Sequence, residues 1–204
     1  MPVVEGVHRP TERFPSSVSP DGQFLVFREG ATTGFDLGIL PLDAPQDERL
    51  LLSSDFAELH GAISPDGRWL AYASDESGQR EVYVRSFPDV DSGRWHVSAG
   101  GGESPVWSRA TRELFYRVRG FPVSAMMAVS YQADDEGFFA SAPELLFESE
   151  HVFGPSGRNY DVTPDGQRFL MIKAAPSDRS VDGAPQVVVV LNFDEELKRR
   201  VPID

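Results

Sequence analysis

The stretch SPDGRWLAY at residues 64–72 recurs along the chain and predicts its fold. Close copies are SPDGQFLVF at 19–27 and TPDGQRFLM at 163–171, and a diverged copy, SRATRELFY, lies at 108–116. The first residues of successive copies are 45, 44 and 55 residues apart. A self-similar unit of about 40–45 residues is typical of the four-stranded blades of a β-propeller.

The start of each copy predicts a tight turn, and the rest predicts a strand. Proline presets φ, aspartate accepts hydrogen bonds from nearby backbone amides, and a glycine such as Gly67 supplies a left-handed conformation. The carboxylates Asp21, Asp66 and Asp165 recur in three units, so we expect them to fix turns rather than to act in catalysis. The apolar run that follows predicts a strand buried on both faces, as in a sheet that packs between two others.

Three further strands are expected in each unit. One precedes the turn (16–18, 61–63, 105–107 and 160–162), one follows the buried strand (36–40, 81–85, 126–130 and 186–191), and a last one is expected in three units (49–52, 94–98 and 144–147). Four short strands per unit favour a propeller over a sandwich. We therefore predict an all-β fold of the β-propeller type with four repeats.

The chain is expected to form a single propeller-type domain over residues 1–204. The approximate repeats are 14–58, 59–102, 103–157 and 158–193, followed by a short helix or tail at 194–204. The last repeat lacks a fourth strand, whereas residues 2–5 could form a spare one. The spare strand could close a four-bladed ring, or the chain could be part of a six- to eight-bladed propeller. Open edges would also allow two arcs to pair as a homodimer.

Composition limits the partners. The chain has 204 residues, a formal net charge of −13 and no cysteine. An acidic balance argues against a general nucleic-acid-binding surface, and disulfides and cysteine-ligated metal sites are excluded.

Residues 1–13 contain no apolar run typical of a signal peptide or membrane span, so membrane insertion is not expected. The third unit has an insertion in the region 132–157, where residues 134–137 and 154–157 are expected to form exposed loops. Propellers usually bind their partners through such loops.

A search for catalytic and metal-binding patterns yields no candidate. The chain lacks the Gly-x-Ser-x-Gly motif of serine hydrolases, and GPSG at 154–157 has the wrong spacing. The scattered histidines, His8, His60, His96 and His151, show no metal-binding spacing and are interpreted as ordinary polar residues. A site assembled from several blades stays open, because loops converge only in three dimensions.

Weaker patterns are interpreted structurally. Asp89–Gly93 resembles the start of a calcium loop but lacks the later ligands, and Asp134–Glu136 is weaker still. Gly100–Gly102 lacks the Lys-Ser/Thr pair of a phosphate loop and is expected to lead the chain into the next blade. The tryptophans are expected to pack rather than to mark a binding surface: Trp69, Trp95 and Trp107. We therefore predict no catalytic, cofactor-binding or metal-binding residues.

The run at 64–72, followed by DESG at 75–78 and EVYV at 81–84, resembles the WD40-like repeat of TolB-type β-propellers. The resemblance covers about residues 14–191. It looks closest to the C-terminal propeller of certain bacterial serine/threonine kinases and winged-helix regulators, whose end is similar to VVLNFDEEL at 189–197. The turn at 109–111 departs from the pattern, and no kinase, DNA-binding or hydrolase region is present in these 204 residues.

This resemblance implies a propeller used for protein–protein interaction or sensing in a bacterium, with a periplasmic or extracytoplasmic location. It implies no catalytic residue, because the repeat motif is structural. The leading expectation is therefore a non-enzymatic module that binds a protein partner. Two alternatives stay open: an enzyme with a metal or acid/base site in the propeller channel, and a structural fragment of a larger multidomain protein.

Overall fold

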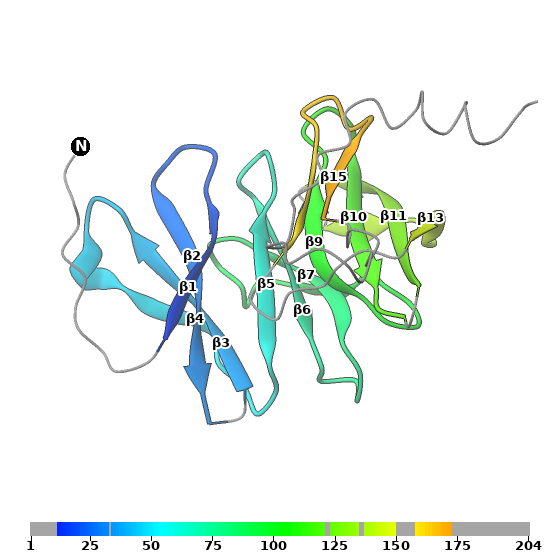
Figure 1. Ribbon diagram of the computed structural model, residues 1–204. Coiled ribbons are helices and arrows are strands. Elements are labelled where there is room, and N and C mark those ends of the chain that lie inside the picture. Colours follow the sequence, from blue (N-terminus) through cyan, green and yellow to red (C-terminus); the bar gives the residue numbers. More distant parts are fainter. Residues whose placement is uncertain (1–11, 33, 121–122, 135–136, 150–157, 173–204) are drawn as a thin grey trace, which may run out of the picture.

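The computed structural model describes residues 12–32, 34–120, 123–134, 137–149 and 158–172. These residues are almost entirely β-structure, and the one helix among them is the 3-10 turn η1 (Pro45–Asp47). Figure 1 shows the sheets following one another across the molecule in chain order. The expected all-β class is confirmed.

Each sheet is antiparallel and built mainly from strands that are neighbours in sequence. The first sheet contains β1 (Arg13–Val18), β2 (Phe24–Ala31), β3 (Gly34–Pro41) and β4 (Arg49–Leu52). The second contains β5 (Glu58–Ile63), β6 (Trp69–Ser74), β7 (Glu81–Ser86) and β8 (Arg94–His96). The third contains β9 (Glu103–Trp107), β10 (Glu113–Val118), β11 (Ser124–Ala133), β12 (Phe138–Ala140) and β13 (Glu144–Ser149). A two-stranded sheet joins β14 (Tyr160–Val162) to β15 (Phe169–Met171).

Every strand expected within the described residues overlaps an observed one. The expected strands at 2–5 and 186–191 and the helix or tail at 194–204 lie outside the described residues. The repeat boundaries, the number of blades, ring closure and homodimer formation therefore stay predictions.

The sheets stack face to face through apolar clusters. All six residues of β6 are buried, as expected for a strand between two sheets. On one side, Leu70 and Tyr72 pack in a cluster with Val26 and Leu37 of the first sheet. On the other side, residues of the second and third sheets share a cluster that includes Ala71, Leu114 and Trp107. A third cluster joins the third sheet to Tyr160 and Phe169.

The Ser-Pro-Asp-Gly turns have the conformation that the sequence predicts. Gly22, Gly67 and Gly166 have φ of 71°, 73° and 75°. The Asp66 carboxylate accepts hydrogen bonds from the Ser64 hydroxyl (2.5 Å) and the Arg68 backbone N–H (3.1 Å). Asp21 and Asp165 accept equivalent bonds. The recurring carboxylates therefore fix turns.

The diverged turn at 108–111 closes by a different route. The Ser108 N–H donates to the Glu113 carbonyl at 2.9 Å, as the Ser64 N–H does to the Trp69 carbonyl. Thr111 stands in place of the glycine without a positive φ. Its N–H and hydroxyl both donate to the Ser108 hydroxyl, at 3.1 and 2.7 Å. The serine that starts the turn is thus the part that this copy retains.

Replacing Gly67 with valine should destabilise the protein by about 1–3 kcal/mol, because a β-branched residue is strained at positive φ. The strain is conformational, since a Cβ there would meet only Pro20 Cδ at 3.7 Å. The measurement is urea unfolding at equilibrium. Gly30→Val is the matched control, because Gly30 has open space and lacks a positive φ. Equal stability of the two variants would contradict this assignment.

The insertion in the third repeat contains more structure than expected. It lengthens β11 and returns through β12, which pairs Ala133 with Phe138. Phe138 is 1% exposed, and its ring lies near those of Trp69 and Trp107 at centroid distances of 5.4 and 5.9 Å. The expected strand at 144–147 overlaps β13, whereas β12 was not expected, and its buried aromatic ring packs between the second and third sheets. The loop expected at 154–157 lies outside the described residues.

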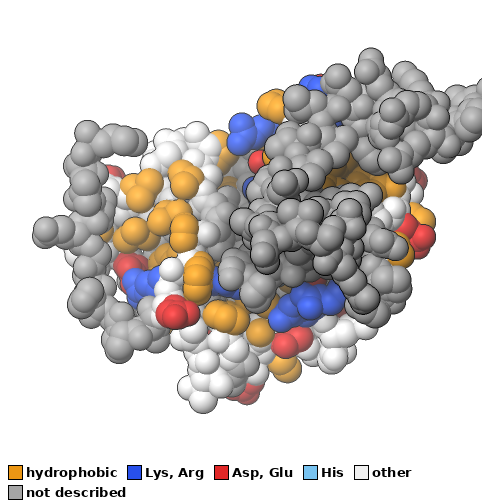
Figure 2. Space-filling model, viewed as in Figure 1, with side chains coloured by type: hydrophobic (Ala, Val, Ile, Leu, Met, Phe, Trp, Pro, Cys, Tyr) orange, Lys and Arg blue, Asp and Glu red, His pale blue; other side chains and the backbone are white. Residues whose placement is uncertain are grey.

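Figure 2 shows hydrophobic side chains gathered on the side of the molecule formed by the β1–β4 sheet.

Within the described residues, the structure contains no helix with the length and apolarity needed to cross a bilayer.

Candidate functional site

The first strands of the sheets, β1, β5, β9 and β14, are tied to one another across the blades. The Ile63 N–H donates to the Ser17 hydroxyl at 3.1 Å, and Trp107 Nε1–H donates to the Ala62 carbonyl at 2.9 Å. The Tyr160 hydroxyl donates to the Ser104 carbonyl at 2.6 Å. In a propeller such strands surround a central channel, so the space they line is the candidate functional site.

A cavity of about 830 Å³ lies where these strands reach their turns, and we call it the turn-face cavity. Its lining repeats with the blades. The residue before each turn is apolar: Val18, Ile63, Trp107 and Val162. The residue that follows each turn serine or threonine is Pro20, Pro65, Arg109 or Pro164. This volume lies in the range of about 300–1,000 Å³ that is typical of ligand sites.

The turn-face cavity combines an apolar wall, formed by the residue before each turn, with serine and threonine hydroxyls and the charged groups of Arg109, Arg158 and Asp161. Val18 is 54% exposed, so an apolar wall faces solvent, whereas Trp107 is buried and its indole N–H is satisfied. Arg158 also lines the cavity, and its guanidinium lies 3.5 Å from the Asp161 carboxylate. An apolar wall beside hydroxyl and charged groups suits a chain segment that carries both apolar and polar side chains.

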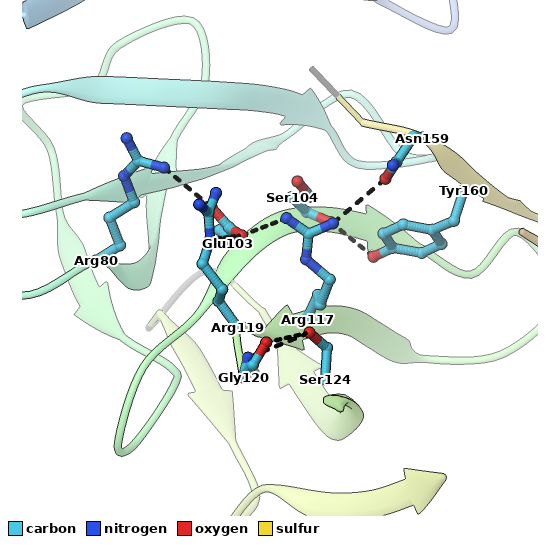
Figure 3. A network of polar contacts seen from close by, with 9 residues as sticks. All are labelled: Arg80, Glu103, Ser104, Arg117, Arg119, Gly120, Ser124, Asn159 and Tyr160. Atoms are coloured by element: carbon cyan, nitrogen blue, oxygen red, sulfur yellow. Dashed lines mark hydrogen bonds and ion pairs between the residues drawn. The ribbon is translucent and has the colours of Figure 1, made fainter. Parts of the chain in front are cut away.

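An arginine cluster surrounds Glu103 beside these strands (Figure 3). Arg119 donates to both carboxylate oxygens of Glu103, at 3.0 and 3.2 Å, and Arg80 donates to one of them at 3.1 Å. Arg117 forms a buried ion pair with the same carboxylate. Arg117 also donates to the Asn159 amide oxygen at 3.3 Å. The cluster thereby connects the second, third and last described sheets.

The environment of Glu103 keeps it ionised. Burial alone would raise the pKa of this carboxyl, but hydrogen bonds from Arg119 and Arg117 outweigh burial and hold the pKa at about 2. Three arginines therefore share one carboxylate, and the cluster has an excess of positive charge inside an acidic protein. The net charge of the sequence gave no sign of this local excess.

The first strands bulge at their other end. The register shifts between Pro15 and Ser17 in β1 and between Leu59 and Ala62 in β5. His60 and Ser104 have positive φ, 58° and 55°, at equivalent places four residues before the turn serine. Bulges redirect side chains and are frequent near functional sites. Here a cavity of about 220 Å³, the bulge cavity, lies beside them; its lining includes Phe14, Ser16, Arg28, His60, Pro105 and Arg158.

The interpretation of His60 as an ordinary polar residue is incomplete. Its imidazole lines the bulge cavity, and its Nδ1 atom is buried without a hydrogen-bond partner. Burial lowers the pKa of His60 to about 4, so the ring is neutral at physiological pH. His96 instead stacks on Tyr83, with ring centroids 4.9 Å apart. His8 and His151 lie outside the described residues.

The other described residues that were singled out in the sequence lie in turns or in the apolar core. The Asp89 carboxylate accepts a hydrogen bond from the Ser92 hydroxyl at 2.5 Å within a turn. Gly100 and Gly101 have positive φ and connect β8 to β9, as expected. Trp69 and Trp107 are buried in the cluster between the second and third sheets, with Trp95 packed against it. In the part of the chain that the structure describes, no group of three or more His, Asp or Glu side chains could hold a metal ion.

Sequence comparison finds neither a matching family model nor a matching curated protein. Solved structures do match. TolB from Agrobacterium tumefaciens has a TM-score of 0.55 and 19% identity over 71% of this chain and 51% of its own. A puromycin-hydrolysing peptidase of Mycobacterium tuberculosis has a TM-score of 0.58 and 20% identity over 79% and 28%. An oligogalacturonate lyase in complex with manganese has a TM-score of 0.56 and 15% identity over 84% and 50%.

These matches define the class of the protein. The chain has a β-propeller fold, and its structural neighbours include TolB-like propellers, as the sequence resemblance implies. The chain spans about half the length of these solved structures or less. The closer resemblance to the propellers of kinases and winged-helix regulators stays a prediction.

The expectation that the chain is not an enzyme is wrong as an inference from this fold. Two of the matched structures are a peptidase and a lyase. The repeated motif is structural, but it builds a scaffold whose strand ends and loops can carry different groups in each blade. A structural repeat motif therefore does not exclude catalysis.

Proposed function

We propose that the protein is an interaction or sensing module that binds a segment of a protein partner in the turn-face cavity. The observation that carries this proposal is the fourfold lining of the cavity, in which an apolar residue stands before each of four turns. The TolB-like neighbours support an interaction role.

The chemistry of the cavity favours a polypeptide segment that places an apolar side chain against the wall at Val18 and polar groups against the hydroxyls and charges beside it. The wall provides Val18, Ile63 and Val162 side chains, and burial of apolar surface is the main favourable contribution to association. The proline-bearing turns beside it are held by internal hydrogen bonds, so little ordering is needed on binding. Arg109 is exposed at the edge and is available to an acidic group on the partner.

Val18→Asp should weaken binding at the turn-face cavity, because it places a charge on an apolar wall that the partner must cover. The measurement selects ligands from a displayed library of random linear peptides and titrates the enriched peptides by calorimetry. Wild-type protein should bind a peptide that carries an apolar side chain, and Val18→Asp should weaken that binding by about tenfold or more.

Leu145→Asp is the matched control. Leu145 is as exposed as Val18, at 56%, but lies on β13 and does not line the cavity. This variant should bind the selected peptide like the wild type. The proposal fails if no peptide is enriched, or if the two variants bind the selected peptide equally well.

A further inference from the structure

Arg28 is a buried cation that has no ion-pair partner in the described part of the chain. Arg28 lies on β2 and is 5% exposed. Its Cζ atom lies 4.4 Å from the ring centroid of Phe14 and 4.7 Å from that of Phe35. These rings come from β1 and β3, the two strands that flank β2. Among the described residues, no carboxylate forms an ion pair with Arg28. Burial lowers the pKa of Arg28, and the positive charge of Arg80 lowers it further.

The equivalent arginine of another blade has a partner. Arg28 and Arg117 each lie nine residues after the serine that starts their turn. Arg117 stands opposite Glu103 on the neighbouring first strand and forms an ion pair with it. Arg28 stands opposite Phe14 at the corresponding register. The first sheet therefore has an arginine at the same position as the third sheet, but Phe14 stands where the third sheet has Glu103.

The guanidinium of Arg28 borders the bulge cavity, and the charged side chains in the described lining of this cavity are arginines. The lining of the bulge cavity includes Arg28, His60 and Arg158, and it contains no Asp or Glu among the residues that the structure describes. His60 contributes a buried Nδ1 atom that has no hydrogen-bond partner. A buried guanidinium and a buried imidazole nitrogen from different blades, neither with a hydrogen-bond partner among the described residues, therefore meet at one cavity.

We propose that the bulge cavity binds a carboxylate, with Arg28 as its principal ligand and His60 as a second contact. The planar guanidinium matches a carboxylate through two parallel N–H···O bonds. Arg158 in the same lining is paired with Asp161, so Arg28 is the cation that needs a counter-charge. One such cation beside a neutral imidazole balances a single negative charge better than the double charge of phosphate. At about 220 Å³ the cavity is smaller than sites for drug-sized ligands, so it suits a small acid or one carboxylate of a peptide.

The bulge cavity adjoins the turn-face cavity and shares Ser16 and Arg158 with it, but Arg28 and His60 line the bulge cavity and not the turn-face cavity. The inference does not rest on the proposed function. The test is thermal unfolding of the full chain with increasing sodium acetate or sodium succinate, with chloride at equal ionic strength as the reference. A ligand of the native state raises the midpoint in a concentration-dependent way. Carboxylate should raise the midpoint of the wild type beyond the effect of chloride.

Arg28→Met should weaken this carboxylate effect by about tenfold or more in apparent Kd, because it removes the charged donor and keeps an apolar side chain between the rings. Arg94→Met is the matched control, since Arg94 is an exposed arginine paired with Glu76 away from the cavity. It should respond like the wild type. An equal response of Arg28→Met and the wild type, or a response of the wild type to inorganic phosphate alone, would overturn the proposal.

A direct readout covers the case in which Arg28→Met does not fold. Acetate added to the ¹⁵N-labelled wild type should shift the NMR signals of the Arg28 side-chain Nε–H and the His60 ring, while those of Arg94 stay unchanged. Unshifted signals at Arg28 would overturn the proposal. A short peptide with a free C-terminus, compared with its amidated form, then distinguishes a peptide carboxylate from a small acid as the source.

Discussion

Glu103→Gln is expected to destabilise the folded protein by about 3–5 kcal/mol, the usual cost of breaking a buried ion pair by removing one partner. The Glu103 side chain is 3% exposed and that of Arg117 is 4% exposed. Glutamine keeps the shape but removes the only carboxylate that Arg80, Arg117 and Arg119 share in the described structure. The variant therefore leaves positive charges close together without compensation.

The measurement is equilibrium unfolding in urea at neutral pH. Glu76→Gln is the control, because Glu76 pairs with the half-exposed Arg94, and such surface pairs contribute about 1 kcal/mol or less. A loss for Glu103→Gln no larger than for Glu76→Gln would show that the arginine cluster does not hold the blades together.

The same variant allows a test by pH. The pKa of Glu103 is about 2 in the folded protein, below its ordinary value of 4.5, so the ionised form is stabilised by folding. This contribution is fully present above pH 4.5 and is lost as the pH falls from 4.5 towards 2. The shift corresponds to about 3 kcal/mol. The stability gap between the wild type and Glu103→Gln should narrow by about that amount over this interval, and a constant gap would contradict the assignment.

The parts of the fold that the sequence predicts are those that local chemistry specifies. Each turn is determined by residues within six positions of one another: Ser64 bonds the Trp69 amide, and Asp66 bonds the Arg68 amide. The strand that follows is recognisable because both of its faces are apolar. Such patterns repeat in each unit, so the blades could be predicted from a single sequence.

The cavities could not be predicted in this way, because they depend on contacts between distant residues. Arg28 and His60 come from different blades and are brought together by bulges that leave no clear sequence signal. Once the register is known, comparing equivalent positions shows that Arg117 faces a glutamate and Arg28 a phenylalanine. The residues that form these two pairs can be read from the sequence, but the positions of the bulges are needed to know which residues stand opposite each other.

The hairpin of β11 and β12 is a second feature that sequence reasoning missed, and Phe138→Ala should show how much it contributes. Loss of about 3–5 kcal/mol is expected, as for other buried phenylalanines replaced by alanine. Phe138 is 1% exposed and stacks on Tyr131 at 5.2 Å between ring centroids. It also approaches Trp69 of the second sheet and Trp107 of the third, so its removal leaves a cavity between two blades.

Phe139→Ala is the control that the structure offers for this prediction. Phe139 is the next residue on the same strand, but it is 57% exposed, so its truncation should change stability by about 0.5 kcal/mol or less. Because alternate residues of a strand face opposite sides, the pair separates packing between blades from the presence of the strand itself. Urea unfolding followed by tryptophan fluorescence measures both variants. Equal losses would mean that the packing of Phe138 between the sheets does not contribute to stability.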